Sequence, residues 1–106
     1  MGKKNYELTI NGLNTAISDF LRTNWESLTF HVIDNLNIIG FEDVQVFVQN
    51  AFNGAGDYKY QGNVRPKICD DNGYYVKNMK INGTAHIEMV NNEIIVDSIR
   101  KPISIN

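Results

Sequence analysis

The stretch that decides the fold runs from residue 79 to residue 89, where apolar and polar positions alternate. It reads Met79-Lys80-Ile81-Asn82-Gly83-Thr84-Ala85-His86-Ile87-Glu88-Met89. The odd positions carry apolar or small residues, and the even positions carry polar residues. Because successive side chains of a strand point to opposite faces, the pattern predicts a strand with one face in the core. The other face is left to solvent or to a partner.

A two-residue turn follows this strand and predicts a hairpin. Asn91 and Asn92 are residues that adopt the positive φ values required by tight hairpin turns. The residues after the turn, 93–97, resume the strand pattern. The register set by this turn places His86 directly opposite Asp97 on the neighbouring strand.

Two earlier segments, residues 44–49 and 58–68, show the same period of two and predict a second hairpin. The glycine-rich residues 53–57 form the turn between them. Pro66 donates no ladder hydrogen bond, so we expect an edge or a bulge at that position. After Pro102, we expect residues 103–105 to continue only as an edge strand or a tail.

The segment from Asn11 to Ile39 has the spacing of an amphipathic helix. Apolar residues recur at steps of three and four, at Leu13, Ile17, Phe20, Leu21, Trp25, Leu28, Val32 and Leu36. Asn11 or Asn14 can cap the start, and Gly40 suits the position after the end. A break near Thr23-Asn24 or Thr29 is the alternative, and it would divide the segment into two shorter helices.

Together these elements predict one α+β domain over residues 1–106. Its long N-terminal amphipathic helix packs on a four-stranded antiparallel meander sheet. The small residues Gly83 and Ala85 would let the helix approach the sheet closely. The element order is similar to the cystatin-like and NTF2-like arrangements, and this resemblance implies a helix wrapped by a curved sheet.

Composition and charge narrow the class of protein. With 42% hydrophobic and 21% charged residues in 106, the chain has the make-up of a globular domain with one core. The net charge of −2 gives no overall attraction to nucleic acid. No apolar run is long enough to span a membrane, and no apolar signal core follows the N-terminus. The only cysteine, Cys69, fits a reducing compartment, so we expect a cytoplasmic protein.

His86 and Asp97 are the candidate catalytic pair. An imidazole held by a carboxylate can act as a general base, but the same pair also occurs as an exposed ion pair on a sheet surface. Because the sequence supplies neither a nucleophile nor a third orienting group, we favour a protein that is not an enzyme. The two histidines, His31 and His86, lack metal-site spacing. We therefore expect no metal and no cofactor.

The exposed sheet face and nearby aromatic residues predict a noncatalytic protein–protein interaction module. Aromatic side chains are enriched at protein interfaces. The predicted interaction surface consists of Phe47, Tyr74, Tyr75, Lys80, Thr84, His86 and Glu88. We expect a larger protein as the partner, and a small accessory or virus-encoded inhibitor of a host protein is one concrete form of this hypothesis.

Three alternatives remain open. The first is a small-molecule-binding domain or an enzyme without marked motifs, with a pocket between helix and sheet at Tyr58 and Tyr60. The second is a homodimer formed through Phe47 and the outward sheet face. The third is single-stranded nucleic-acid binding, because tyrosines and basic residues interleave between residues 58 and 80. The acidic residues in that region dilute its charge, and we do not expect nucleic acid as the partner.

Overall fold

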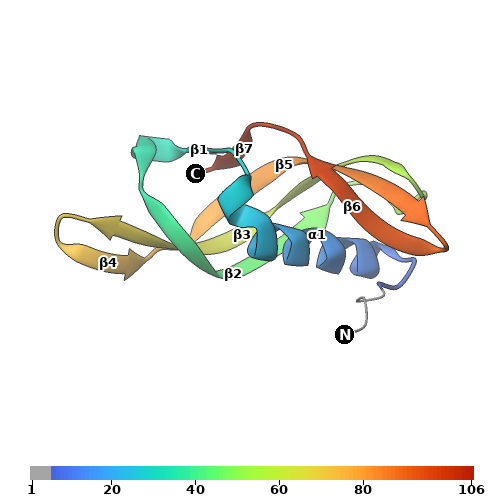
Figure 1. Cartoon of the computed structure of the whole chain (residues 1–106), viewed down its shortest axis with the longest axis horizontal. Helices are drawn as coiled ribbons and strands as arrows, with labels where there is room; N and C mark the ends of the chain where they lie inside the picture. The colour runs from blue at the N-terminus through green and yellow to red at the C-terminus, as the bar shows by residue number, and fades with distance from the viewer. Residues whose placement is uncertain (1–5) are drawn as a thin grey trace.

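One α-helix and seven strands form the described part, residues 6–106, of the computed structural model of this chain (Figure 1). The first elements are α1 (Ile10–Asn24), β1 (Phe30–Val32), β2 (Ile38–Val48) and β3 (Gly56–Asp70). They are followed by β4 (Gly73–Val76), β5 (Met79–Val90), β6 (Glu93–Ile99) and β7 (Ile103–Ile105). Short 3-10 helices occupy Trp25–Ser27 and Ile33–Asn35. The fold class is α+β, as predicted. No helix among these residues has the length and apolar character needed to cross a membrane.

The helix is shorter than predicted and starts from a different cap. Thr9 is the N-cap residue, and its Oγ1 accepts a hydrogen bond from the backbone N–H of Gly12 at 3.1 Å. The caps predicted at Asn11 and Asn14 were therefore wrong, because both residues lie inside the helix.

The chain leaves the helix at Asn24, where the alternative prediction placed a break. The second helix of that alternative is not formed, since strands β1 and β2 take its place. Asp34 and Asn35 have φ values of 59° and 51°, which a right-handed helix cannot accommodate. Gly40, predicted to follow the helix, lies within β2.

The predicted meander is present as the antiparallel series β2-β3-β5-β6. It is part of a larger mixed sheet, so the predicted four-stranded antiparallel sheet was wrong in strand number and direction. The additional pairings are β4 with β3, β7 with β5, and a parallel pairing of β1 with β7. Strand β7 lies between β1 and β5, and therefore it is not the edge or tail predicted after Pro102.

Local turn and bulge predictions were confirmed. Asn91 and Asn92 have φ values of 52° and 61° and connect β5 directly to β6. On β2, register shifts flank the position where Phe41 pairs with Pro66 of β3. The proline therefore lies in an irregular part of the β2–β3 ladder, as expected for a residue that cannot donate a ladder hydrogen bond.

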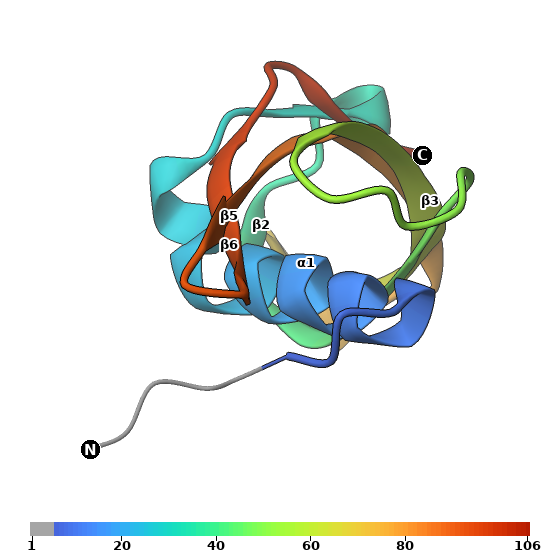
Figure 2. The same cartoon turned by 90° about the vertical axis from the view of Figure 1, so that its right-hand side faces the viewer.

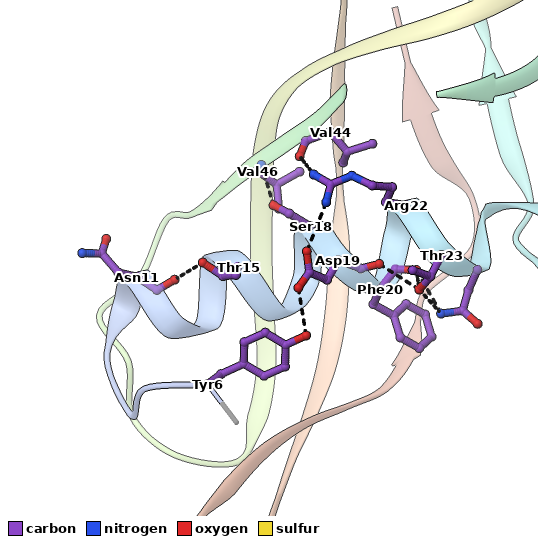
Figure 3. Close-up of polar contacts among 11 residues, drawn as sticks. Tyr6, Asn11, Thr15, Ser18, Asp19, Phe20, Arg22, Thr23, Val44 and Val46 are labelled. Carbon is purple, nitrogen blue, oxygen red and sulfur yellow. Dashed lines mark hydrogen bonds and ion pairs between the residues drawn. The ribbon is translucent and has the colours of Figure 1, made fainter. Parts of the chain in front are cut away.

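The helix lies in the opening of a strongly curled sheet, between β2 and β6 (Figure 2). Side chains of α1 pair with the backbone at the edge of β2. Ser18 Oγ accepts from the N–H of Val46 at 3.1 Å, and Arg22 Nη2 donates to the carbonyl of Val44 at 3.1 Å (Figure 3). Asn14 Oδ1 similarly accepts a hydrogen bond from the backbone N–H of Val48 at 2.8 Å. The helix thus occupies an edge that would otherwise offer unpaired backbone groups to another chain.

The core fills the inside of this curl. The predicted inward face of residues 79–89 was confirmed, with Ile81, Ala85 and Ile87 at most 1% exposed. Gly83 was predicted to let the helix approach the sheet, but the side chain that lies closest to it is that of Tyr60. It pairs with Tyr60 across the β3–β5 ladder, and a Cβ added at Gly83 would lie 2.5 Å from the tyrosine Oη. The missing side chain therefore makes room for the Tyr60 ring.

A three-stranded arm extends from the end of the molecule opposite the β5–β6 hairpin (Figure 1). It consists of residues 38–41 of β2, 66–70 of β3 and all of β4. Ile68 of β3 pairs with Ile38 on one side and with Tyr75 on the other. The arm gives the molecule its elongated shape, with principal extents of 48 × 30 × 20 Å.

Candidate functional site

A cluster of charged side chains surrounds His86 on the outer face of the sheet. Strand β5 places His86 in the middle of three paired strands, with Asp57 of β3 directly opposite on one side. Ser98 of β6 lies opposite on the other side. Glu88 follows His86 by two residues on β5, so the two side chains share the outer face.

Both ring nitrogens of His86 contact a carboxylate. Nδ1 lies 2.8 Å from Asp57 Oδ1, and Nε2 lies 2.7 Å from Glu88 Oε1. Arg100 Nη2 donates to the second oxygen of Asp57. Asp57 therefore links the imidazole of His86 to the guanidinium of Arg100.

These contacts favour the protonated form of His86 and the ionised form of Asp57. The hydrogen bond to Asp57, followed by that to Glu88, raises the pKa of His86 above its usual value of 6.5. The hydrogen bond from His86 lowers the pKa of Asp57, and the nearby Arg100 adds to this effect. A protonated imidazole has no free lone pair, so this arrangement does not favour His86 as a general base.

The predicted direct pairing of His86 with Asp97 was wrong by one position. A register shift follows His86, so that Ser98 pairs with His86 and Val96 pairs with Ile87. Asp97 is the additional residue of this bulge. Its carboxylate nevertheless stays near the cluster, because ligand atoms of His86, Glu88 and Asp97 all lie within 4.8 Å of one another.

Sequence reasoning missed Asp57 and Arg100 as members of the cluster. Asp57 is 29 residues from His86 in the chain, and the β3–β5 pairing brings them together. The available signal was the meander itself, since adjacent antiparallel strands can be aligned through their polar outer faces. Arg100 directly follows the end of β6, beyond the bulge at Asp97, and the sequence offers no comparable pattern for its position.

The remaining outer-face residues of the predicted surface lie toward the other end of β5. Phe47 is 54% exposed and borders a hollow of about 350 Å³ that Lys80 also lines. Gln61, Asn63 and Asn82 supply amide groups to the same hollow. Thr84 lies between this hollow and the His86 cluster along β5. The outer face is therefore mainly polar, with Phe47 as its exposed aromatic residue.

Tyr74 and Tyr75 lie on the arm, away from the His86 cluster, and they do not share one face. Tyr74 pairs with Cys69, whereas Tyr75 pairs with the buried Ile68. Because neighbouring residues of a strand point to opposite sides, the two rings lie on opposite faces of β4. Tyr74 is 77% exposed and Tyr75 is 39% exposed.

The arm carries an apolar hollow of about 380 Å³, which we call the arm hollow. It is lined by Ile39, Lys67, Tyr74 and Val76, and Tyr75, whose ring lies on the other face of β4, borders it between Tyr74 and Val76. Lys67 of the central strand β3 pairs with Val76, and Ile39 lies beside it at a bulge of β2. Apolar side chains from two outer strands thus flank a lysine on the strand between them.

Tyr58 and Tyr60, the residues predicted for a ligand pocket, lie in the core, with exposures of 4% and 1%. Tyr58 Oη donates to the carbonyl of Gly54 at 2.7 Å and accepts from the N–H of Asn53 at 2.8 Å. Neither ring is available for stacking on nucleic-acid bases, so the aromatic–basic pattern does not form a base-stacking surface at these two positions.

A hollow between helix and sheet does exist, but it lies between α1 and β6. It measures about 420 Å³ and is lined by apolar residues that include Phe20, Ile94 and Val96. Tyr6 closes one side and donates a hydrogen bond to Asp19 at 3.0 Å (Figure 3). Burial, together with Asp19, raises the pKa of Tyr6 to about 12, so the phenol is neutral at physiological pH.

Comparisons with protein families, curated proteins and solved structures found no match to this chain. The resemblance to cystatin-like and NTF2-like arrangements therefore stays a prediction.

Proposed function

We propose that this chain is a noncatalytic protein-binding module and that the arm hollow is its main contact surface. The observation that supports this proposal is the exposure of Tyr74, 77%, next to the 41% exposed Ile39. Both line the same hollow on a part of the sheet that extends from the main body. Large apolar side chains grouped at an exposed site are typical of binding surfaces.

The chemistry of the arm hollow suits a side chain inserted by a partner. A tyrosine ring offers a large apolar surface with few rotatable bonds, so ordering it on binding costs little conformational entropy. The strands that carry Tyr74 and Ile39 hold their backbones in place before binding. The proposed binding therefore requires little rearrangement of this chain.

Lys67 defines the polar part of the expected contact. Its side chain is exposed and lines the arm hollow between the apolar flanks. An apolar residue next to a carboxylate on the partner would fill the hollow and place a negative charge near the lysine. We therefore expect an extended or looped segment with one apolar anchor and a neighbouring Asp or Glu.

Replacing Tyr74 with serine should weaken binding at least about tenfold, because truncation of an anchoring aromatic residue typically costs about 2 kcal/mol or more. The measurement is quantitative capture from a lysate of the source organism, followed by titration of the identified partner. Phe47→Ser is the matched control, since Phe47 is also exposed but lies on the main sheet face. Loss of binding with Phe47→Ser and not with Tyr74→Ser would contradict the arm as the contact surface.

The more specific hypotheses stay predictions. Inhibition of a host protein is one form that protein binding can take.

A homodimer through Phe47 predicts that the Phe47→Ser control has the mass of a monomer in light scattering, whereas the unmodified chain has twice that mass. Small-molecule binding between helix and sheet is the alternative function, and native mass spectrometry of the purified chain would show a discrete added mass.

A further inference from the structure

We propose that His86, Glu88 and Asp97 form a zinc-binding site on the outer face of the β5–β6 hairpin. One nitrogen or oxygen ligand atom from each residue lies within 4.8 Å of the other two. The site goes beyond the proposed protein-binding function and does not depend on it. The sequence did not predict a metal site, because its two histidines lack metal-site spacing and two of the three ligands proposed here are carboxylates.

Two of the ligands come from a regular part of the sheet. His86 and Glu88 are separated by one residue on β5, which places both on the outer face of one strand. Strand β5 is paired on both sides at His86, with β3 and with β6. The backbone that carries the imidazole is therefore held in place, as a preorganised metal site requires.

The third ligand is supplied by the bulge of β6. At this point Asp97 and Ser98 together oppose His86, and Asp97 is the additional residue. Bulges redirect side chains and are frequent beside functional sites. Zinc binds imidazole nitrogen and carboxylate oxygen at about 2.0–2.2 Å, so modest side-chain rotations would bring all three ligand atoms onto one ion.

Asp57 has the position of an outer partner that orients the imidazole. Its Oδ1 lies 2.8 Å from Nδ1 of His86, and its other oxygen accepts from Arg100. With Nδ1–H donated to Asp57, Nε2 is the nitrogen that faces Glu88 and is available to the metal. Metal-binding histidines usually donate their second N–H to a carboxylate in this way.

The charges of the group are also consistent with a divalent cation. When zinc replaces the proton between Nε2 and Glu88, that proton is released to solvent and the carboxylate becomes a ligand. Glu88 and Asp97 then supply two negative charges to the ion, while Asp57 is paired with Arg100. Three protein ligands leave one tetrahedral position for water or for a ligand from a partner.

The test is calorimetric titration of zinc chloride into the full chain, freed of purification tag and treated with chelator. We expect one zinc ion per chain. His86→Gln and Asp97→Asn should each weaken binding at least about tenfold, and Asp57→Asn should weaken it about 10- to 100-fold through loss of the orienting contact. Glu93→Gln on the same hairpin and His31→Gln are the controls, and both should bind zinc as the unmodified chain does.

Circular dichroism of each variant verifies that the fold is retained before affinities are compared. The exposed positions of His86 and Asp97 make both substitutions compatible with the core. Absence of zinc binding by the unmodified chain would overturn the proposal. Zinc binding that is unchanged in both His86→Gln and Asp97→Asn would also overturn it, as would zinc binding that is lost in Glu93→Gln or His31→Gln instead.

Discussion

Replacing Gly62 with alanine is expected to lower the free energy of unfolding by about 4 kcal/mol, near the upper end for single substitutions. A Cβ at this position would lie 2.0 Å from the carbonyl oxygen of Gln45 and 2.7 Å from Cα of Val46. Both atoms belong to the backbone of β2, which is paired with β3 on one side and bonded to α1 on the other. The clash can be relieved only by moving β2 away from β3.

Gly40→Ala is the matched control for this substitution. Gly40 lies on β2 in the same β2–β3 ladder, but the nearest atom to an added Cβ is the flexible Lys67 Cδ at 3.9 Å. We expect its stability to change by less than about 1 kcal/mol in denaturant unfolding. Equal stabilities of Gly62→Ala and Gly40→Ala would contradict the close approach of β2 and β3 at Gly62.

The second large effect concerns two tyrosines of the core, Tyr58 and Tyr60. Replacing each with phenylalanine is expected to change the free energy of unfolding in opposite directions. Tyr58→Phe removes a hydroxyl that makes two hydrogen bonds, and it should destabilise the fold by about 1–2 kcal/mol. Within residues 6–106, the buried hydroxyl of Tyr60 has no hydrogen-bond partner, and burial raises its pKa. Tyr60→Phe should therefore stabilise the fold by about 1 kcal/mol, since it removes an unsatisfied polar group.

The two phenylalanine variants control for each other because each loses a single oxygen atom from β3. Parallel urea titrations of both variants and the unmodified chain measure the difference, which we expect to be about 2–3 kcal/mol. If Tyr60→Phe were as destabilising as Tyr58→Phe, the Tyr60 hydroxyl would have a partner in solution. The packing of its ring over Gly83 would then need revision.

The parts of the fold that were predicted correctly depend on local patterns. The alternation in residues 79–89 reports burial directly, because a one-residue slip would move the whole apolar set to the wrong face. The Asn91-Asn92 turn was equally clear, since positive φ at both positions suits few residues other than glycine and asparagine. Hairpins join neighbouring segments, so no long-range information was needed.

The region after Asn24 was predicted wrongly because its apolar spacing fits a helix while its surroundings favour strands. Leu28, Val32 and Leu36 recur every four residues, yet all three are half-buried outside any α-helix. The segment from Phe30 to Val32 is stabilised by a parallel pairing with Ile103–Ile105. A contact between segments more than 70 residues apart leaves no local pattern that periodicity can detect.

The candidate site was predictable only in part for a related reason. His86 and Glu88 share a strand, so their common face follows from the sequence. Asp57 comes from a different strand, and Asp97 is displaced by a bulge that adds one residue to β6. The arm hollow likewise depends on β4, a four-residue strand that the predicted meander did not contain.

The central claim is that the arm hollow contacts another protein, and site-specific photocrosslinking tests it most directly. A photoreactive phenylalanine analogue replaces Tyr74 in one variant and the exposed Glu26, beside the helix end, in a second. We predict that irradiation in the source lysate joins the analogue at position 74 to one discrete protein, and that position 26 yields no such product. Identical products from both positions, or no product from position 74, would contradict the arm as the binding surface.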